Sequence, residues 1–345
     1  MNTSDNILES LELGLNVSLE LPPNCTESFI STVNLEVFMK GFEYIIFISC
    51  FFSTFLHVYV IRKAIKYIKR GTGDECLHVF LLSMTLGDLL LTCFCYPIEQ
   101  LREQEIIFPP MWLNICQHFL TWLGLLVSSA SLILLNADKL LFFKFPLRYT
   151  NIVTSTKAVI IVISVWIGCF SFVCLCWYLE CFQCDENCQQ ILILPNRVVM
   201  YIVFTVSACI VPTVTSFCVA IYIMNVVTSH RTKLADENGN SSHALTSRLR
   251  TFYFIFMTTI FTVVTLLPYR LYNIKRQLSD FVGIDDATDE PIHCIGLYYP
   301  WILLYLISMN AILNPLITVT VLPQYRFRWL CKVMGCSTSP APVHV

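Results

Sequence analysis

Seven apolar stretches, each long enough to cross a bilayer as a helix, constrain the fold of this chain more than any other feature of its sequence. A hydrocarbon layer of about 30 Å requires roughly 20 mostly apolar residues in helical form, because backbone groups find no water inside it. The stretches cover about 42–61, 79–98, 115–140, 158–179, 198–227, 252–272 and 295–321. The sequence therefore predicts an all-α membrane protein built as a bundle of seven transmembrane helices.

The composition agrees with a surface that faces lipid. Of 345 residues, 56% are apolar and 13% are charged, whereas a soluble domain carries about 25% charged residues. The net charge of −2 lacks the basic excess typical of nucleic-acid binding, so no nucleic-acid partner is expected. No zinc-protease motif, nucleophilic-serine motif or phosphate-binding glycine loop occurs, which argues against an enzyme. A transporter or channel is a distant alternative, because we find no internal repeat of the kind such proteins contain.

The distribution of Lys and Arg predicts the orientation of the spans. If the spans alternate in direction, most of the 22 basic residues fall on one side, and an excess of basic residues marks the cytoplasmic side. These residues are Arg62, Lys63, Lys66, Lys69, Arg70, Lys139, Lys144, Arg148, Lys157, Arg231, Lys233, Arg248, Arg250, Arg326, Arg328 and Lys332. We therefore expect an extracellular N-terminus and a cytoplasmic C-terminus.

This orientation divides the chain into three parts. Residues 1–40 are expected to be an extracellular tail, 41–322 the bundle, and 323–345 a short amphipathic eighth helix with a cytoplasmic tail. Asn2, Asn16 and Asn24 each begin an N-x-Ser/Thr acceptor, so the tail is predicted to be glycosylated. Chance is the alternative, since Asn240 begins such a triplet in a predicted cytoplasmic loop.

Cysteines add two predictions. Six of the 17 fall in predicted external segments, where an even number permits complete pairing; they are Cys25, Cys116, Cys181, Cys184, Cys188 and Cys294. Cys331 and Cys336 follow the amphipathic tail segment, where S-acylation is one interpretation and two ordinary thiols the other.

A series of short motifs occurs in a fixed order along the spans. The motifs and marker residues are 82–89 with Asp88-Leu89, Asp138-Lys139-Leu140, Pro146-Leu147-Arg148-Tyr149, Trp166, Pro212, Pro268, Asn310 and Asn314-Pro315. In order and spacing they resemble the rhodopsin-like (class A) G-protein-coupled receptors, over roughly residues 41–336. The resemblance implies a plasma-membrane receptor with an extracellular ligand, a heterotrimeric G protein as partner, and an amphipathic helix at 323–334.

A polar cluster in the middle of the bundle is implied by the same resemblance. Asp88 lies in mid-span, where an ionisable group is costly and is interpreted as functional. The resemblance implies that Asp88, Ser128, Asn310 and Asn314 hold a sodium ion and water, and oxygen ligands suit such a hard cation. The alternative is an aspartate that is hydrogen-bonded to its neighbours without an ion.

Several switch residues depart from the family pattern. The Arg of span three is Lys139, which keeps the charge but loses the planar fork of donors; Leu266 replaces a Trp and Thr318 a Tyr. The resemblance nevertheless implies a G-protein interface and switch at Asp138, Lys139, Arg148, Arg248, Arg250, Pro268 and Pro315. Pro212, Pro268 and Pro315 are predicted to form hinges, with simple packing kinks as the alternative. A divergent but working receptor is therefore expected, and an atypical receptor that binds without G-protein coupling is the alternative.

The outer ends of the spans are predicted to form a ligand pocket. Thr121 stands where amine receptors carry an Asp, so an amine ligand is rejected and a peptide or small polar ligand, as in a neuropeptide receptor, is expected. The candidate pocket residues are Glu99, Gln117, His118, Thr121, Trp122, Tyr201, Tyr269, Arg270, Asn273, Trp301 and Tyr305. Arg270 needs a partner at this depth, which is either Glu99 or a carboxylate of the ligand; snorkelling of the side chain towards the interface is the other alternative.

The family also implies a disulfide that ties the second external loop to span three. Cys116 is expected to pair with a Cys of that loop, and Cys188 is the predicted partner. Cys181–Cys184 and Cys25–Cys294 are then the remaining hypothetical pairs, because sequence alone does not define connectivity.

Overall fold

The computed structural model describes most of the helical part of the chain. The described residues are 32–71, 75–104, 106–145, 148–149, 153–184, 188, 191–193, 198–234, 256–258, 260–261, 263–272, 274–275, 299–322 and 324–327.

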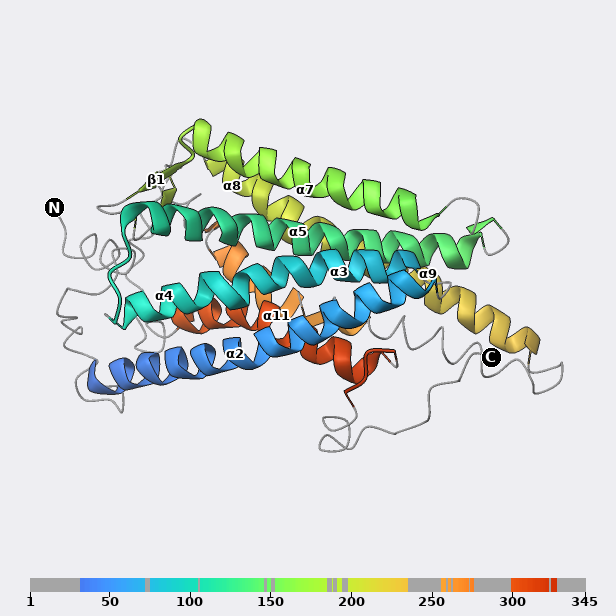
Figure 1. The fold of residues 1–345 in the computed structure, drawn as a ribbon, viewed down its shortest axis with the longest axis horizontal. Helices are drawn as coiled ribbons and strands as arrows, with labels where there is room; N and C mark the ends of the chain where they lie inside the picture. The colour runs from blue at the N-terminus through green and yellow to red at the C-terminus, as the bar shows by residue number, and fades with distance from the viewer. Residues whose placement is uncertain are drawn as a thin grey trace.

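Long helices run side by side and form a bundle (Figure 1). They are α2 (Thr32–Arg70), α3 (Glu75–Leu90), α4 (Tyr96–Glu103), α5 (Met111–Lys144), α7 (Ser155–Tyr178), α8 (Val198–Thr205), α9 (Val211–Leu234) and α11 (Tyr299–Val321). Two π-helical turns, η2 (Leu91–Cys95) and η5 (Val206–Ile210), join α3 to α4 and α8 to α9. Each of these pairs therefore forms one continuous span.

The described residues contain 6 helices that are long and apolar enough to cross a membrane. They match six of the seven predicted stretches. The seventh, 252–272, is helical at each of its described parts, 256–258, 260–261 and 263–272. These helices agree with the bundle that the apolar stretches predict.

Five of these six helices are longer than the apolar stretches that predicted them. The first begins at Thr32, inside the predicted tail 1–40, and ends at Arg70. Only the hydrocarbon-spanning part must be apolar, so polar turns at either end extend a helix without leaving a signal in the hydropathy pattern.

One small element departs from a purely helical architecture. After α7 the chain forms a hairpin of two antiparallel strands, β1 (Phe182–Cys184) and β2 (Ile191–Ile193), with Phe182 opposite Ile193. We call the end of the bundle that carries this hairpin the hairpin end, and the other end the opposite end (Figure 1).

Helices α3 and α5 pack at the centre of the bundle, and α2, α7, α9 and α11 pack against one or both of them. Gly87 and Gly124 permit the closest approach of α3 and α5. A Cβ atom at Gly87 would lie 3.0 Å from the Gly124 carbonyl oxygen, and one at Gly124 would lie 3.0 Å from the Gly87 carbonyl oxygen. The two backbones therefore touch where any larger residue would separate them.

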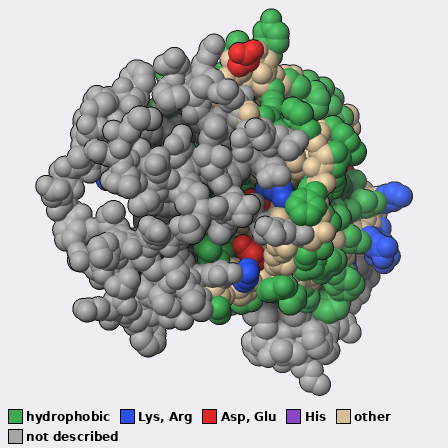
Figure 2. Space-filling view, turned by 90° about the vertical axis from the view of Figure 1, so that its left-hand side faces the viewer, with side chains coloured by type: hydrophobic (Ala, Val, Ile, Leu, Met, Phe, Trp, Pro, Cys, Tyr) green, Lys and Arg blue, Asp and Glu red, His purple; other side chains and the backbone are tan. Residues whose placement is uncertain are grey.

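The outer faces of the helices are apolar. Ile160, Ile163 and Ile167 on α7 are 58%, 53% and 62% exposed. Seen from the hairpin end, apolar side chains cover most of the described part of the rim (Figure 2). Large exposed apolar surfaces are unfavourable in water but are what a lipid-facing bundle requires.

The predicted eighth helix at 323–334 is not confirmed. The described part of that segment, 324–327, is a turn followed by irregular backbone. The Gln324 carbonyl accepts a hydrogen bond from the Tyr67 hydroxyl at 3.0 Å, and the Arg326 carbonyl accepts one from Tyr59 at 3.3 Å. These tyrosines of α2 thus hold carbonyls that a helix would pair with its own amides.

A histidine completes this junction at the opposite end. The Tyr325 hydroxyl lies 2.7 Å from Nδ1 of His78, whose ring stacks on Tyr67. Burial, to which Tyr67 adds a smaller effect, raises the pKa of Tyr325, so this hydroxyl stays neutral. The segment after α11 is therefore fastened to α2 and α3.

Candidate functional site

The predicted pocket contains a cluster of aromatic rings around Arg270. Its guanidinium carbon lies 4.9 Å from the ring centroid of Phe204 and 5.8 Å from each of those of Trp122, Tyr201 and Tyr269. Such distances are those of cation–π contacts. One guanidinium nitrogen donates to the Tyr201 hydroxyl at 3.3 Å. Three of the predicted pocket residues thus surround a fourth, and Phe204 completes what we call the Arg270 box.

The predicted Glu99–Arg270 bridge does not form in the structure. Among the described residues, the ion pair found joins Lys139 to Asp138, and no carboxylate pairs with Arg270. Helix α4, which carries Glu99, packs against α2. The rings around Arg270 come instead from α5, from α8 and from its own span. The linear sequence does not reveal this separation.

Other predicted pocket residues form polar contacts that fix the hairpin end of α5. Gln117, which is 1% exposed, accepts a hydrogen bond from Arg102 at 3.1 Å. Thr121 donates to the Gln117 carbonyl at 2.8 Å, so its hydroxyl is bound to its own helix. Tyr305 is buried, stacks on Phe42 and donates to the Met39 carbonyl. Gln117 and Tyr305 thus connect neighbouring helices, and none of the three is among the rings around Arg270.

The disulfide at the hairpin end differs from the predicted one. Cys188 is bonded to Cys184, with Cα atoms 4.4 Å apart, while Cys116 and Cys181 carry free thiols. The predicted Cys116–Cys188 and Cys181–Cys184 pairs are therefore corrected. β1 ends at Cys184, and the chain turns back within four residues through Cys188, whose φ is 53°. Cys184, four positions earlier in the sequence, is therefore the disulfide partner of Cys188 in place of Cys116.

A hydrogen bond, rather than a disulfide, joins Cys188 to α5. His118 Nε2 donates to the Cys188 carbonyl at 3.2 Å. His118 lies one helical turn before Trp122, on the same side of α5. Cys188 is therefore held on α5, one helical turn from Trp122 of the Arg270 box.

The predicted polar cluster assembles in the middle of the bundle. Asp88 is fully buried and accepts a hydrogen bond from Asn314 at 2.8 Å through Oδ2. Its Oδ1 has no hydrogen-bond partner among the described residues. Ser128, Asn310 and Asn314 line a small adjacent cavity, and Thr265 donates to the Asn310 side-chain oxygen at 3.4 Å. A buried carboxylate oxygen without a donor, together with the side-chain oxygens of Ser128, Asn310 and Asn314, is a ligand set of the kind that a hard cation prefers.

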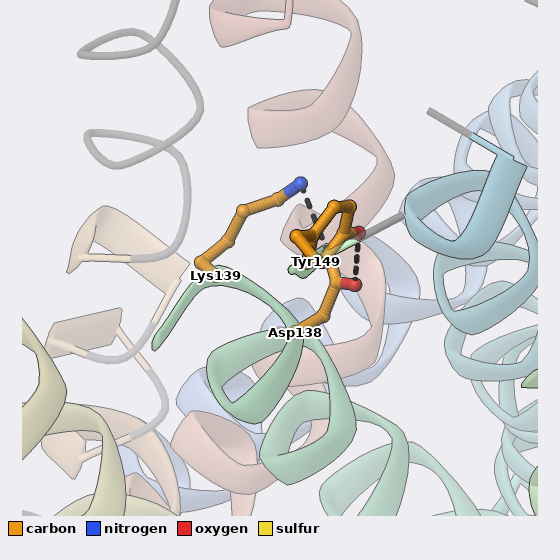
Figure 3. A network of polar contacts seen from close by, with 3 residues as sticks. All are labelled: Asp138, Lys139 and Tyr149. Atoms are coloured by element: carbon orange, nitrogen blue, oxygen red, sulfur yellow. Dashed lines mark hydrogen bonds and ion pairs between the residues drawn. The ribbon is translucent and has the colours of Figure 1, made fainter. Parts of the chain in front are cut away.

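The predicted switch lies at the opposite end of α5. Asp138 is 2% exposed and Lys139 is 5% exposed. The Lys139 ammonium lies 3.0 Å from Asp138 Oδ2, and the Tyr149 hydroxyl donates to Asp138 Oδ1 at 2.6 Å (Figure 3). The Tyr149 ring meets Phe142 edge-on, at 5.1 Å between centroids. A buried carboxylate is thus held between a cation and a hydroxyl, which we call the Asp138 lock.

Other members of the predicted switch are partly visible. Arg148 is exposed next to Tyr149. Pro315 lies inside α11 and Pro268 lies in the helical part 263–272. Arg248 and Arg250 lie outside the described residues, as do Asn2, Asn16, Asn24, Asn273, Cys331 and Cys336, and the side chain of Trp301 is also outside. Glycosylation, acylation and the basic loop between spans five and six therefore remain predictions.

Three residues that complete these sites were not predicted from the sequence. Phe204 lies three residues after Tyr201 and so shares its helix face, a spacing that could have revealed it. Tyr149 lies eleven residues after Asp138, and its contact depends on how the chain turns after α5. Thr265 precedes Arg270 on the same span and reaches Asn310 only because α11 packs beside it.

Comparison with known proteins places the chain in a family. The model of the 7 transmembrane receptor (rhodopsin family) matches residues 65–317, which confirms the predicted seven-helix fold class. The chain is similar to the G-protein coupled receptor aex-2 of Caenorhabditis elegans, with 27% identity over 330 residues, which is 92% of this chain and 89% of that protein. Receptors of this kind are multi-pass membrane proteins and not enzymes. Because the match covers most of a chain that forms a helical bundle, this chain belongs to the rhodopsin family of seven-transmembrane receptors.

Proposed function

We propose that the chain is a plasma-membrane receptor that binds a peptide or small polar ligand outside the cell and activates a heterotrimeric G protein inside it. In this proposal the N-terminus is extracellular and the hairpin end faces outward. The observation that carries it is the Asp138 lock, in which the buried ammonium of Lys139 is paired with the carboxylate of the preceding residue, Asp138.

The chemistry of the lock suits a switch despite the loss of the family's Arg. A lysine keeps the positive charge but offers a compact ammonium in place of a planar fork. In the closed structure that charge is paired with Asp138, which also holds Tyr149. When the helices separate at this end, the carboxylate meets water and Lys139 becomes free to contact a protein partner.

The hairpin end supports a ligand that is not an amine. The Thr121 hydroxyl is bound to its own helix and offers no charge to an ammonium group. The pocket instead contains the buried cation of Arg270. Acidic residues of the predicted external loop, among them Asp285, Asp286 and Glu290, give a peptide with basic residues a favourable approach.

We also include a sodium ion in the proposal, at Asp88. Asp88 Oδ1 would be its anionic ligand, and the oxygens of Ser128, Asn310 and Asn314 would complete the site. The ion would stabilise the closed bundle by neutralising a buried carboxylate, an effect expected of any group that binds only one of two states.

A nucleotide-exchange assay tests the proposal. Membranes that contain the receptor and a purified G protein are screened with a peptide library, and Lys139→Ala is compared with wild type for each active peptide. We expect peptide-dependent exchange in wild type and its loss in Lys139→Ala with unchanged peptide binding. Peptide binding without exchange in wild type would contradict coupling and favour a receptor that binds ligand without a G protein.

A further inference from the structure

We propose that Arg270 is a carboxylate-recognition residue, and that the ligand of this receptor presents a carboxylate next to an apolar group. This inference deepens the proposed receptor function by naming the chemistry of its ligand, and so rests on that function. It is based on the surroundings of the guanidinium in the Arg270 box, and no part of the family comparison assigns this residue a role.

The guanidinium is buried without a counter-charge. Arg270 is 7% exposed, and among described residues no carboxylate lies within ion-pair distance. Its Nε has no hydrogen-bond partner there. The neighbour that accepts is the Tyr201 hydroxyl, at 3.3 Å. Burial of a cation without a paired anion is costly, so the box favours a ligand that brings one.

In the box, one guanidinium nitrogen donates to Tyr201, while Nε has no acceptor among the described residues. The guanidinium contacts four aromatic rings, those of Trp122, Tyr201, Phe204 and Tyr269. Aromatic rings stabilise the positive charge through their π-faces, but they do not replace hydrogen bonds to the N–H groups. The fork of a guanidinium matches the two oxygens of a carboxylate in a bidentate pair. The site therefore combines a bidentate donor with apolar walls.

The box lies near the hairpin end, which is the end that faces outward in the proposed receptor. Trp122 is one helical turn below His118, which contacts the hairpin loop through Cys188. Tyr201 lies three residues after the start of α8 at Val198. The Arg270 box is therefore close to the hairpin end of α5 and α8.

The apolar walls select among anions. A carboxylate carries one charge and its neighbouring carbon chain is apolar, whereas a phosphate monoester carries about two charges at neutral pH. The four aromatic rings around Arg270 therefore favour a carboxylate with its apolar neighbour over a phosphate monoester. Two sources present such a group: the free C-terminus of a peptide and a small organic acid.

The experiment measures thermal unfolding of the full-length receptor in detergent with defined probes. The probes are N-benzoylglycine as a small acid and the tripeptide Ala-Ala-Phe as a free C-terminus, each paired with its amide. Variants are Arg270→Gln and, as the matched control, Lys275→Gln, which removes an exposed cation five residues further along the chain. Binding to the folded state raises the melting temperature, because it stabilises that state by RT ln(1 + [L]/Kd).

We expect at least one acid to raise the melting temperature of wild type and of Lys275→Gln, with its amide inactive. In Arg270→Gln the dissociation constant of that acid should rise roughly 30-fold or more, as for loss of one member of a buried charge pair. A response to the tripeptide alone identifies a peptide terminus, and a response to the small acid alone identifies an organic acid.

Equal stabilisation by acid and amide, no stabilisation by either acid, or an unchanged acid affinity in Arg270→Gln would overturn the inference. If Arg270→Gln fails to fold, Arg270→Lys serves in its place and should weaken the acid by loss of the bidentate fork. The melting assay contains no G protein, so it tests the carboxylate inference separately from coupling. Acid binding without nucleotide exchange would refute the proposed coupling alone. Peptide-driven exchange that is the same in Arg270→Gln as in wild type would refute the carboxylate inference alone.

Discussion

The Asp138 lock predicts that removing one hydroxyl raises the basal activity of the receptor. The substitution is Tyr149→Phe, which keeps the ring and its edge-on contact with Phe142 but deletes the donor to Asp138 Oδ1. Asp138 is 2% exposed, so water does not readily replace that donor in the closed bundle. The Lys139 ion pair to the other carboxylate oxygen remains.

The magnitude depends on the kind of bond that is lost. A hydrogen bond to a charged group contributes about 1.5–3 kcal/mol. If the open state exposes Asp138 to water, the variant loses this bond in the closed state only. Since about 1.4 kcal/mol changes an equilibrium constant tenfold, the population of the open state should rise about ten- to a hundredfold.

Ligand-independent nucleotide exchange by a purified G protein measures this population, normalised to receptor at the cell surface. The matched control is Tyr178→Phe, because Tyr178 is 83% exposed and its hydroxyl has no role in the lock. The control should match wild type. Basal exchange in Tyr149→Phe that equals wild type, with normal ligand-driven exchange, would refute the reasoning, because the hydroxyl would then favour neither state.

The packing, the polar cluster and the hairpin give three further predictions. Gly87→Ala places a Cβ 3.0 Å from the backbone of α5 and should lower the free energy of unfolding by about 1–3 kcal/mol, measured as a lower melting temperature. The control Gly168→Ala meets nothing within 4 Å and should be neutral or slightly stabilising. Equal losses of stability in the two variants would contradict the close approach of α3 and α5. Sodium chloride at about ten times its dissociation constant should stabilise wild type by about 1.4 kcal/mol relative to choline chloride, and Asp88→Asn should abolish the difference; an unchanged sodium response would exclude this site. In denatured, non-reduced receptor, alkylation followed by peptide mapping should modify Cys116 and spare Cys188, and a peptide that links these two cysteines would contradict the structure.

Much of the fold could be predicted because it depends on length and polarity alone. An apolar run of about 20 residues in lipid must be helical whatever its detailed sequence, and six of the predicted stretches correspond to complete helices. The ends were less predictable, as the start of α2 at Thr32 shows. Helix ends reach the water-accessible region, where the backbone is no longer forced to pair with itself.

The site was predictable where partners lie on elements whose packing the family pattern implies. Asp88 and Asn314 are 226 positions apart, yet they were grouped correctly and hydrogen-bond in the structure. The predicted pairing of Cys188 was wrong because the pairing depends on the local backbone conformation. The φ of 53° at Cys188 cannot be predicted from the spacing of the cysteines.

Arg270 shows a different limit of the sequence. Its need for a partner was evident from depth alone, but its contacts come from α5, from α8 and from its own span. The rotation of each helix about its axis decides whether an acidic or an aromatic side chain faces a buried cation. In a span that is apolar on all sides, the sequence gives little information about this rotation. The aromatic box could therefore be described only once the helices were placed.

A receptor of this kind requires an odd number of membrane crossings, and the accessibility of tags on Met1 and Val345 tests that number most directly. In intact cells, antibodies should label a tag at Met1 without permeabilisation and a tag at Val345 only after it. Labelling of both tags in intact cells, or of neither, would place both ends on one side of the membrane and contradict a seven-span receptor.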